Sequence, residues 1–377
     1  MKEIDYYWLG LSTISGLGSI RMNKLINYFG DPLSIWKADK MELENVLGSG
    51  SLAEKIVRER VKLDLEDLME RIEKNKIKYL TLMNIDYPEN LKNIYDPPPV
   101  LYYKGEFIFS NTGISIIGSR RCTTYGKKTA EKIAYELAER GIIVISGMAR
   151  GIDTHAHIGA LKAKGKTVAV LGSGLDVIYP PENKELFLEI QEKGAVISEY
   201  PPGVEPLAGN FPQRNRIISG LSVGVLVVEA AYKSGSLITA NLALEQGREL
   251  FAIPGNIDRQ QSTGANNLIK EGAKMVTEIQ DIIEEIYLYK SNNNEEYFNP
   301  EKENKLFYPE LSTEEKEIVE IFQEETEITV DELIRLTNKS PERVNTVLLK
   351  LELKGVVSRG PGKKYFFMGL QSLLKPI

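Results

Sequence analysis

The sequence predicts an α/β fold: an extended Rossmann-like, doubly wound sheet, with a helical domain before it and a winged-helix domain after it. Between about residues 112 and 288, short apolar runs rich in valine and isoleucine alternate with amphipathic helical segments, which is typical of a parallel sheet covered on both faces. Residues 1 to about 75 show helical spacing alone, and a polar stretch precedes a last segment with its own helices. We expect a helical domain at 1–75, the sheet domain at 76–289, a linker at 290–309 and a winged helix at 310–377.

The overall composition fits a soluble protein of two or three domains. The 377 residues are 42% hydrophobic and 27% charged, and the formal net charge is −6. Cys122 is the single cysteine, and His155 and His157 are the two histidines, which excludes a disulfide framework and leaves a metal site almost without ligands. The N-terminus carries acidic residues where a signal peptide has an apolar core, and no apolar run could cross a bilayer. We therefore expect a cytoplasmic protein with no membrane span.

The N-terminal region is expected to form short helices. Apolar residues recur at helical spacing over residues 14–32, on either side of Gly16 and Gly18. This pattern resembles a helix-hairpin-helix (SAM-like) module, which contacts DNA backbone through amides beside its glycines. A small helical packing module fits the same residues, and both interpretations stay open. In the bridging region that follows, the prolines at 97–99 stop any helix and force an extended path.

Five short apolar runs predict the strands of the sheet domain, because continuous Val- and Ile-rich runs bounded by glycine are typical of strands buried on both faces. Helices are predicted between them, for example over residues 126–141 and 236–247. The five runs read ISIIG, IIVISG, KTVAVLG, AVISEY and VGVLVVEA.

The predicted carboxyl ends of these strands are rich in glycine and serine. Ligands of doubly wound sheets bind at this edge, where glycine lets a ligand approach the backbone and helix-opening amides attract anions. Arg120 adds a guanidinium group that suits phosphate oxygens. Val177 replaces the third glycine of a dinucleotide fingerprint after Gly172, and Arg121 stands where a Walker loop needs its first glycine. The sequence therefore predicts a phosphate-binding edge but neither an NAD site nor an ATP site.

Positive charge gathers at this edge although the whole chain is negative. No acidic residue occurs between Gly113 and Ala130 or between Pro206 and Val228, while both segments contain arginines. Phe211 lies in the second segment, where it either belongs to the core or stacks on a base, an interaction of about 1–3 kcal/mol. Together these features favour binding of single-stranded nucleic acid through local positive potential.

The C-terminal region has the pattern of a winged helix-turn-helix. Ser312 and Glu315 form a capping box, and Ser340 followed by Pro341 is a favoured helix start. The segment RGPGKK at 359–364 is a basic wing suited to phosphate contact. Because the candidate recognition helix is mostly apolar, we expect this domain to bind protein or, weakly, duplex DNA, and a transcription factor that reads base edges is disfavoured.

Residues 114–273 contain seven motifs in a fixed order: IIGSRRCTTYG, SGMARGIDTHAHIGAL, TVAVLGSGLDVIYPPENKEL, SEYPPG, FPQRNRIISGLS, VVEAAYKSGSLITANLALEQGRELFAIPGN and GANNLIKEGA. Together they closely resemble the DNA-processing protein A family, also called DprA or Smf, and the bridging region and both terminal domains fit the same family. The resemblance implies a homodimer that binds single-stranded DNA without strong sequence preference during uptake of transforming DNA. It also implies protection of the strand and help in loading a RecA-type recombinase on it. We expect no catalytic residue, no metal and no cofactor.

The resemblance implies a DNA- and phosphate-binding site built from three segments. The arginine of the Gly-Ser-Arg turn becomes a phosphate ligand, the FPQRNR segment becomes a loop that holds the strand, and the SGSLIT segment opens a helix toward the same cleft. The implied residues are Gly118, Ser119, Arg120, Phe211, Arg214, Asn215, Arg216, Lys233, Ser234, Gly235, Ser236 and Thr239.

Some residues of these motifs also have structural interpretations. Asn215 and Arg216 could brace their loop internally. Asp153 is expected to cap its helix, because Asp is a favoured N-cap, and His157 is expected to bond to the backbone. Glu229 is expected to be a buried group that orients the arginines.

A nucleotide phosphoribohydrolase is the main alternative function, because the SGSLIT and PGN segments resemble parts of those enzymes. They use a Gly-Gly-x-Gly-Thr loop followed by a glutamate on the same helix. Here the glycine cluster is missing, and no acidic residue lies between Glu229 and Glu245. Cleavage of an N-glycosidic bond needs a placed carboxylate, so the sequence disfavours this alternative.

Overall fold

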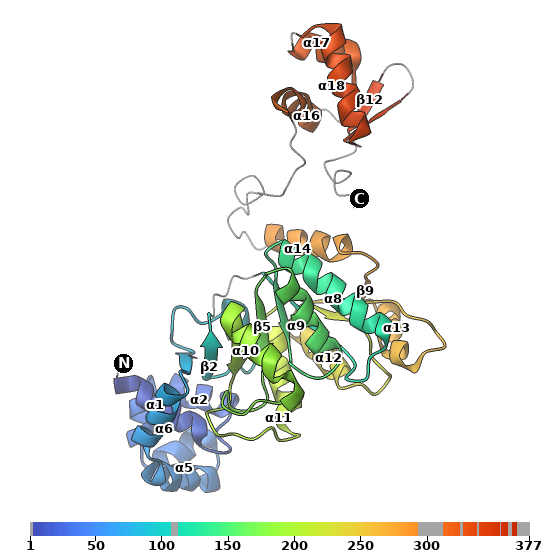
Figure 1. Cartoon of the computed structure of the whole chain (residues 1–377). Coiled ribbons are helices and arrows are strands. Elements are labelled where there is room, and N and C mark those ends of the chain that lie inside the picture. Colours follow the sequence, from blue (N-terminus) through green and yellow to red (C-terminus); the bar gives the residue numbers. More distant parts are fainter. Residues whose placement is uncertain are drawn as a thin grey trace. The chain divides into compact units, whose positions relative to one another are not determined.

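The computed structural model describes residues 3–106, 112–292, 312–324, 327–337, 339–354, 356–360 and 364–367. The chain divides into two compact units, Met1–Asn293 and Asn294–Ile377, whose elements are drawn in Figure 1. The expected linker at 290–309 lies outside the described residues from 293 onward, and so do residues 361–363 of the expected basic wing.

Six helices open the first unit. Side chains of Asp31, Asp39, Ser49 and Asp64 accept backbone N–H bonds at the starts of four of them, which satisfies amides that have no partner inside the helix. Gly16, between the first two helices, has φ +93°, a left-handed conformation that favours glycine. The helices are α1 Glu3–Thr13, α2 Ser19–Phe29, α3 Pro32–Lys37, α4 Lys40–Leu47, α5 Gly50–Lys62 and α6 Leu65–Lys74.

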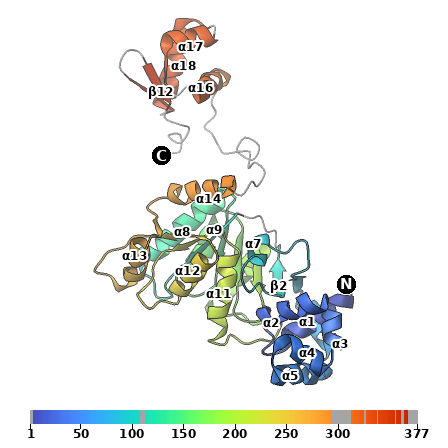
Figure 2. The same cartoon turned by 180° about the vertical axis from the view of Figure 1, so that it is seen from behind.

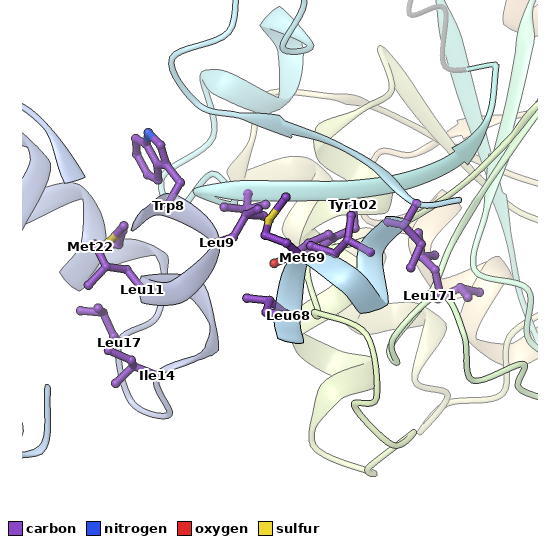
Figure 3. Packing of buried hydrophobic residues seen from close by; sticks show 14 of the residues in the cluster. Trp8, Leu9, Leu11, Ile14, Leu17, Met22, Leu68, Met69, Tyr102 and Leu171 are labelled. Carbon is purple, nitrogen blue, oxygen red and sulfur yellow. The ribbon is translucent and has the colours of Figure 1, made fainter. Parts of the chain in front are cut away.

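These helices share a core with the sheet that follows. Leu9 of α1 and Met69 of α6 belong to the same buried cluster as Tyr102 and Leu171 of the sheet region (Figure 3). The Tyr102 hydroxyl also lies 3.0 Å from the Ser12 hydroxyl, within hydrogen-bond distance. Residues 1–293 thus form one compact unit, and a domain boundary at residue 75 stays a prediction.

The sheet has nine strands in the order β1-β2-β6-β5-β4-β3-β7-β8-β9. The five predicted strands are confirmed as β3 to β7, and they pair in parallel, as do β8 and β9. The sequence did not predict β8, β9 or the antiparallel pair β1 and β2, which extends the sheet beyond β6. The strands are β1 Lys78–Thr81, β2 Val100–Gly105, β3 Gly113–Ile117, β4 Ile143–Ser146, β5 Thr167–Val170, β6 Ala195–Ser198, β7 Gly224–Val227, β8 Glu249–Ala252 and β9 Lys274–Met275.

Helices cover both faces of this sheet, as Figures 1 and 2 show from opposite sides. Apolar side chains of α8, α9 and α14 pack in one buried cluster, and those of α7, α11, α12 and α13 pack in another. Helix α10 packs against β5 and β6 together with the N-terminal helices. The helices are α7 Glu89–Lys92, α8 Thr124–Glu139, α9 Ile152–Lys162, α10 Lys184–Lys193, α11 Asn210–Gly220, α12 Ser236–Glu245, α13 Thr263–Lys270 and α14 Gln280–Asn292, with 3₁₀ turns η1 Pro181–Asn183 and η2 Gln260–Ser262.

The second unit is a winged helix. The predicted capping box is confirmed, because the Ser312 N–H donates to Glu315 (2.7 Å) and the Glu315 N–H donates to the Ser312 hydroxyl (3.3 Å). Ser340 caps the last helix by accepting from the Arg343 N–H, with Pro341 in the first helical position. The elements are α16 Thr313–Glu324, β10 Glu327–Thr329, α17 Val330–Thr337, α18 Pro341–Leu353, β11 Val357–Arg359 and β12 Lys364–Phe367, with strand order β10-β12-β11.

Candidate nucleic-acid interface

The strand order of the main sheet reverses between β3 and β7. From β3 the chain adds β4, β5 and β6 on one side, and it then returns to add β7, β8 and β9 on the other. At such a point the loops after the two neighbouring strands diverge and leave a crevice at their carboxyl ends. A cavity of about 900 Å³ lies at this edge, between the turn after β3, the turn after β7 and the first half of α11. The fold therefore places a cavity where the sequence predicts phosphate binding.

The structure brings all the predicted binding residues except Arg216 to the lining of this cavity. Arg120 and Lys233 are exposed at its rim, whereas Arg214 and Thr239 are buried in its floor, 3% and 2% exposed. The residues that line it are Gly118, Ser119, Arg120, Phe211, Arg214, Asn215, Lys233, Ser234, Gly235, Ser236 and Thr239.

The Phe211 ring lies beside both cleft arginines. The guanidinium carbons of Arg120 and Arg214 are 5.6 Å and 5.9 Å from the ring centroid, and the Tyr179 ring centroid is 5.6 Å away. A Cβ added at Gly172 would lie 3.0 Å from the Phe211 ring, so the ring packs closely against the backbone there. Phe211 is half-buried and lines the cavity, so it does not belong to the closed core. An aromatic ring flanked by guanidinium groups offers both a stacking surface and positive charge.

Arg214 is held firmly in the floor of the cavity. Its Nη1 donates to the carbonyl oxygens of Gly147 (2.7 Å) and Val170, and its Nε donates to Asn215 Oδ1 (3.2 Å). Burial lowers the pKa of Arg214 to about 10, and the nearby Asp153 carboxylate opposes that shift. The charge is thus preorganised, but several of its donors already have partners inside the protein.

The FPQRNR segment is a helix, so the prediction of a loop is wrong. It forms the first half of α11, with Pro212 in the first turn, where a missing N–H costs no intrahelical bond. Successive residues of a helix turn by about 100°, so Arg214 and Arg216 point roughly 200° apart. One arginine therefore faces the cavity while the other cannot.

Arg216 does not line the cavity, and its contacts agree with the bracing role that the sequence left open. It is 7% exposed, and its Nε lies 3.0 Å from Asp96 Oδ2. Its Nη2 donates to the carboxylate of Glu199 and to the Ser19 hydroxyl (3.0 Å), at the start of α2. Arg216 therefore ties α11 to the N-terminal helices and to the bridging region.

The turn after β7 supplies small polar side chains. The Ser234 and Ser236 hydroxyls lie 2.7 Å apart, and the Ser234 hydroxyl accepts from the Ser236 N–H (3.4 Å). A side chain added at Gly235 would meet open space, so this position leaves room for a ligand. Gly118, in contrast, packs tightly, because an added side chain would come within 2.8 Å of Ile152 and of the Glu229 carbonyl oxygen.

Asp153 does not cap α9 as predicted. It is the second residue of the helix, whose N-cap is Gly151, and its carboxylate accepts from the N–H groups of Gly147 (3.2 Å) and Ala149 (3.3 Å). Burial raises the pKa of Asp153 to about 6, while Arg214 and these N–H donors oppose the shift. Asp153 thus supports the floor of the cavity and pairs electrostatically with Arg214.

Glu229 and His157 also differ from their predicted roles. The Glu229 carboxylate accepts from the Thr123 N–H (2.8 Å) and the Thr123 hydroxyl (2.5 Å), so it fixes the start of α8 and does not orient the arginines. His157 is fully buried, and its Nδ1 lies 2.7 Å from the Thr167 hydroxyl, a side-chain partner and not a backbone one. Across the described ranges, no three His, Cys, Asp or Glu side chains are grouped so as to hold a metal ion.

Several cavity residues were not predicted as binding residues, among them Arg121, Asp153, Tyr179, Gln260 and Gln261. Tyr179 follows the Gly-rich end of β5, and its aromatic ring beside a strand end was a usable indication. Gln260 and Gln261 come from the segment after β8, a strand that the sequence did not predict, so nothing placed them at this edge.

Comparisons with known proteins match most of the chain. The family model described as DNA recombination-mediator protein A matches residues 78–287, and the DprA winged helix domain model matches residues 307–363. Protein Smf of Synechocystis is 36% identical over 95% of this chain and 98% of its own length. The DNA processing protein DprA of Streptococcus pneumoniae is 41% identical over 72% of this chain and 94% of its own length.

Solved structures agree with these matches. The X-ray structure of DNA processing protein A from Streptococcus pneumoniae is 38% identical, covers 76% of this chain and 98% of its own, and has a TM-score of 0.66. DNA processing protein A from Helicobacter pylori, whose structure is described in terms of its single-stranded DNA binding mode, is 34% identical with a TM-score of 0.52 over 57% of this chain and 98% of its own. No helix in the described part of this chain combines the length and apolar character needed to cross a membrane. The chain belongs to the DNA recombination-mediator protein A family, also called DprA or Smf.

Proposed function

We propose that this chain binds single-stranded DNA in the cavity at the β3–β7 edge, without strong sequence preference and without catalysing a reaction. The observation that carries the proposal is the meeting of Arg120, Phe211 and Arg214 at one cavity, although they come from segments far apart in the sequence. Arg120 supplies an exposed charge for a phosphate, and the Phe211 ring supplies a stacking surface for a base. The relative from Helicobacter pylori, described with a single-stranded DNA binding mode, supports the same ligand.

The other cavity residues have supporting roles in this proposal. Arg214 adds positive potential from the floor and fixes the Phe211 ring. Lys233 adds a second exposed charge at the rim, and the hydroxyls of Ser234 and Ser236 offer hydrogen bonds to phosphate oxygens. Nonspecific binding follows from this arrangement, because a ring and phosphate ligands recognise features that every nucleotide has.

We further propose that the bound strand is incoming transforming DNA in the cytoplasm, and that the protein acts as a homodimer that protects the strand and helps load a RecA-type recombinase on it. This part rests on membership of the family, whose model is named for recombination mediation. Its direct test is whether the purified chain speeds assembly of a RecA filament on single strands already coated by a single-strand binding protein.

The phosphoribohydrolase alternative is not favoured. Its mechanism needs a placed carboxylate near the sugar, and the Glu229 carboxylate is engaged by Thr123 at the start of α8. The Asp153 carboxylate faces Arg214 and two backbone N–H groups. Incubation with nucleoside monophosphates tests this alternative, since an enzyme would release free base at a steady rate.

The proposed function is tested by titrating single strands and duplexes at several salt concentrations. The change Arg120→Ala should weaken binding of single strands and lower the slope of log K against log salt by about 0.7, the value for one lost phosphate contact. Arg140→Ala is the matched control, because Arg140 is an exposed arginine at the opposite end of α8. Equal affinity of wild type and Arg120→Ala for single strands, with both proteins folded, would contradict the proposal.

A further inference from the structure

A second cavity, of about 590 Å³, opens at the same edge of the sheet between the start of α8 and the segment after β8. Tyr125 lines it from α8, and Arg259 lines it from the opposite wall. Tyr125 is 54% exposed, and its hydroxyl donates to the Pro254 carbonyl oxygen at 3.5 Å, so the two walls touch at this point. The proposed function assigns no role to this cavity.

Exposed cations lie on or next to the two segments that line the second cavity, although only Arg259 is among the lining residues. Arg121, Lys127, Lys128 and Arg259 are all exposed, and within the described residues none of them forms an ion pair. Lys127 lies at the end of the first turn of α8 and Lys128 directly after it, near the positive end of the helix dipole, which disfavours a cation in that turn by about 0.3–1 kcal/mol. No acidic residue in that turn offsets them. Their positions oppose local helix stability and concentrate positive potential at this edge, which favours an anionic ligand.

The floor of the cavity determines how such a ligand can lie. The Glu229 carboxylate lines it and accepts the Thr123 N–H and hydroxyl, so the floor is negative and the start of α8 is already capped. Phosphate groups are therefore repelled from the floor and attracted to the rim, where Arg259 lies. A base, in contrast, can enter and stack on the exposed Tyr125 ring.

The two cavities are neighbours. Arg121 lines the first cavity, and Thr123 and Tyr125, two and four residues later, line the second. Gln260 lines the first and Arg259 the second. A strand that leaves the first cavity past Arg121 thus meets Tyr125 next, without crossing an acidic surface residue of α8.

We propose that the second cavity is a further nucleotide subsite for the same single strand, in which Tyr125 stacks on a base while Arg259 and Lys128 hold the flanking phosphates. The inference rests on the proposed function, because it assigns the path that the strand takes beyond Arg120 and Phe211. Lys128 is assigned this role because it follows Tyr125 by three positions, which places the two side chains on the same side of α8.

The test compares a short and a long oligothymidylate, of about 5 and about 20 nucleotides. These lie near the lower limit and above the upper limit of the roughly 4–16 nucleotides that one OB-fold groove occupies. Tyr125→Leu should lower affinity for the long strand by about 5- to 160-fold, the range expected for one lost stacking contact, and leave affinity for the short strand unchanged. Arg259→Ala should lower the salt slope for the long strand by about 0.7 and leave the short strand unchanged. Tyr125→Phe, which keeps the ring, should bind both strands like wild type.

The outcomes separate this inference from the proposed function. If Arg120→Ala weakens both strands but Tyr125→Leu and Arg259→Ala weaken neither, the second subsite is wrong and the first cavity stands. If Tyr125→Leu weakens the short strand as much as the long one, Tyr125 acts through the fold of the first cavity, and the second subsite is again wrong. If Arg120→Ala binds both strands like wild type, the proposed function itself fails.

Discussion

Helix α11 contains two arginines that lie two positions apart and have different orientations and partners. Arg214 faces the cavity, close to the Phe211 ring, whereas Arg216 faces away and is enclosed by Asp96 and Glu199. Both are almost fully buried, so burial does not distinguish them. The difference lies in their partners: Arg216 forms ion pairs with two carboxylates, while Arg214 donates to carbonyl oxygens and has the single carboxylate of Asp153 nearby.

Helix α9 shows the same division. Asp153 lines the cavity, and His157, one turn later, lies between the helix and β5, where it bonds to Thr167. A motif rich in polar residues therefore contains one group that supports the floor of the cavity and one that lies in the interior of the protein. The comparison shows that the cavity depends on polar residues that do not contact a ligand inside it. Each prediction below tests either a residue that faces the cavity or one that faces the protein interior.

The largest effect is expected on the interior side of α11. Arg216→Ala should lower the free energy of unfolding by about 3–5 kcal/mol, because it leaves the Asp96 and Glu199 carboxylates without their cation. Burial already raises the pKa of both carboxyl groups, and Arg216 opposes that shift. Denaturant unfolding measures the change, with Arg140→Ala as a control that removes an exposed arginine. A loss below about 1 kcal/mol would show that Arg216 is not a brace.

A smaller effect is expected on the cavity side of the same helix. Phe211→Ala should weaken single-strand binding by about 1–3 kcal/mol, because a stacked base loses its partner. The salt slope should stay at the wild-type value, since no phosphate contact is removed. Binding titrations at several salt concentrations measure both quantities. Phe211→Tyr keeps the ring and should bind like wild type; if Phe211→Ala also binds like wild type, the ring does not stack on a base.

The sequence predicted where the cavity lies, but not which polar residues face it and which face the protein interior. Apolar runs ending in Gly-Ser identified the strands and the edge, because buried parallel strands leave a distinct pattern. The FPQRNR segment was mistaken for a loop, because Pro212 and the polar residues around it mask a helix whose fully buried apolar residues begin only at Ile217. Without the helix, the opposite directions of Arg214 and Arg216 could not be inferred.

The remaining gaps in the prediction also have physical causes. β9 has two residues, too few for any periodicity to appear. β1 is recognisable as a strand through its pairing with β2, and β2 through its pairing with β6. The bond between Thr123 and Glu229 and the position of Arg214 beside Asp153 are set by the approach of segments that are distant in sequence. Such contacts depend on tertiary structure and leave no local pattern.

The smallest effect concerns His157, on the interior side of α9. The Thr167 hydroxyl donates to the Val144 carbonyl oxygen, so it accepts from His157 Nδ1–H, and Nε2 has no hydrogen-bond partner in the described structure. Burial, with a smaller effect from Arg214, lowers the pKa of His157 to about 3 from a usual value of 6.5. As pH falls below about 6.5, His157 therefore takes up a proton in the unfolded chain but not in the folded chain. The free energy of unfolding is lower by about 1.4 kcal/mol at pH 5.5 for this reason.

His157→Asn should lack this loss, so the difference in unfolding free energy between wild type and variant should shrink between pH 7.5 and about pH 5.5. The raised pKa of Asp153 acts with the opposite sign, because its contribution is lost as pH rises through about 6, but both proteins contain it and it cancels. A difference that stays constant over this range would mean that His157 is protonated in the folded protein.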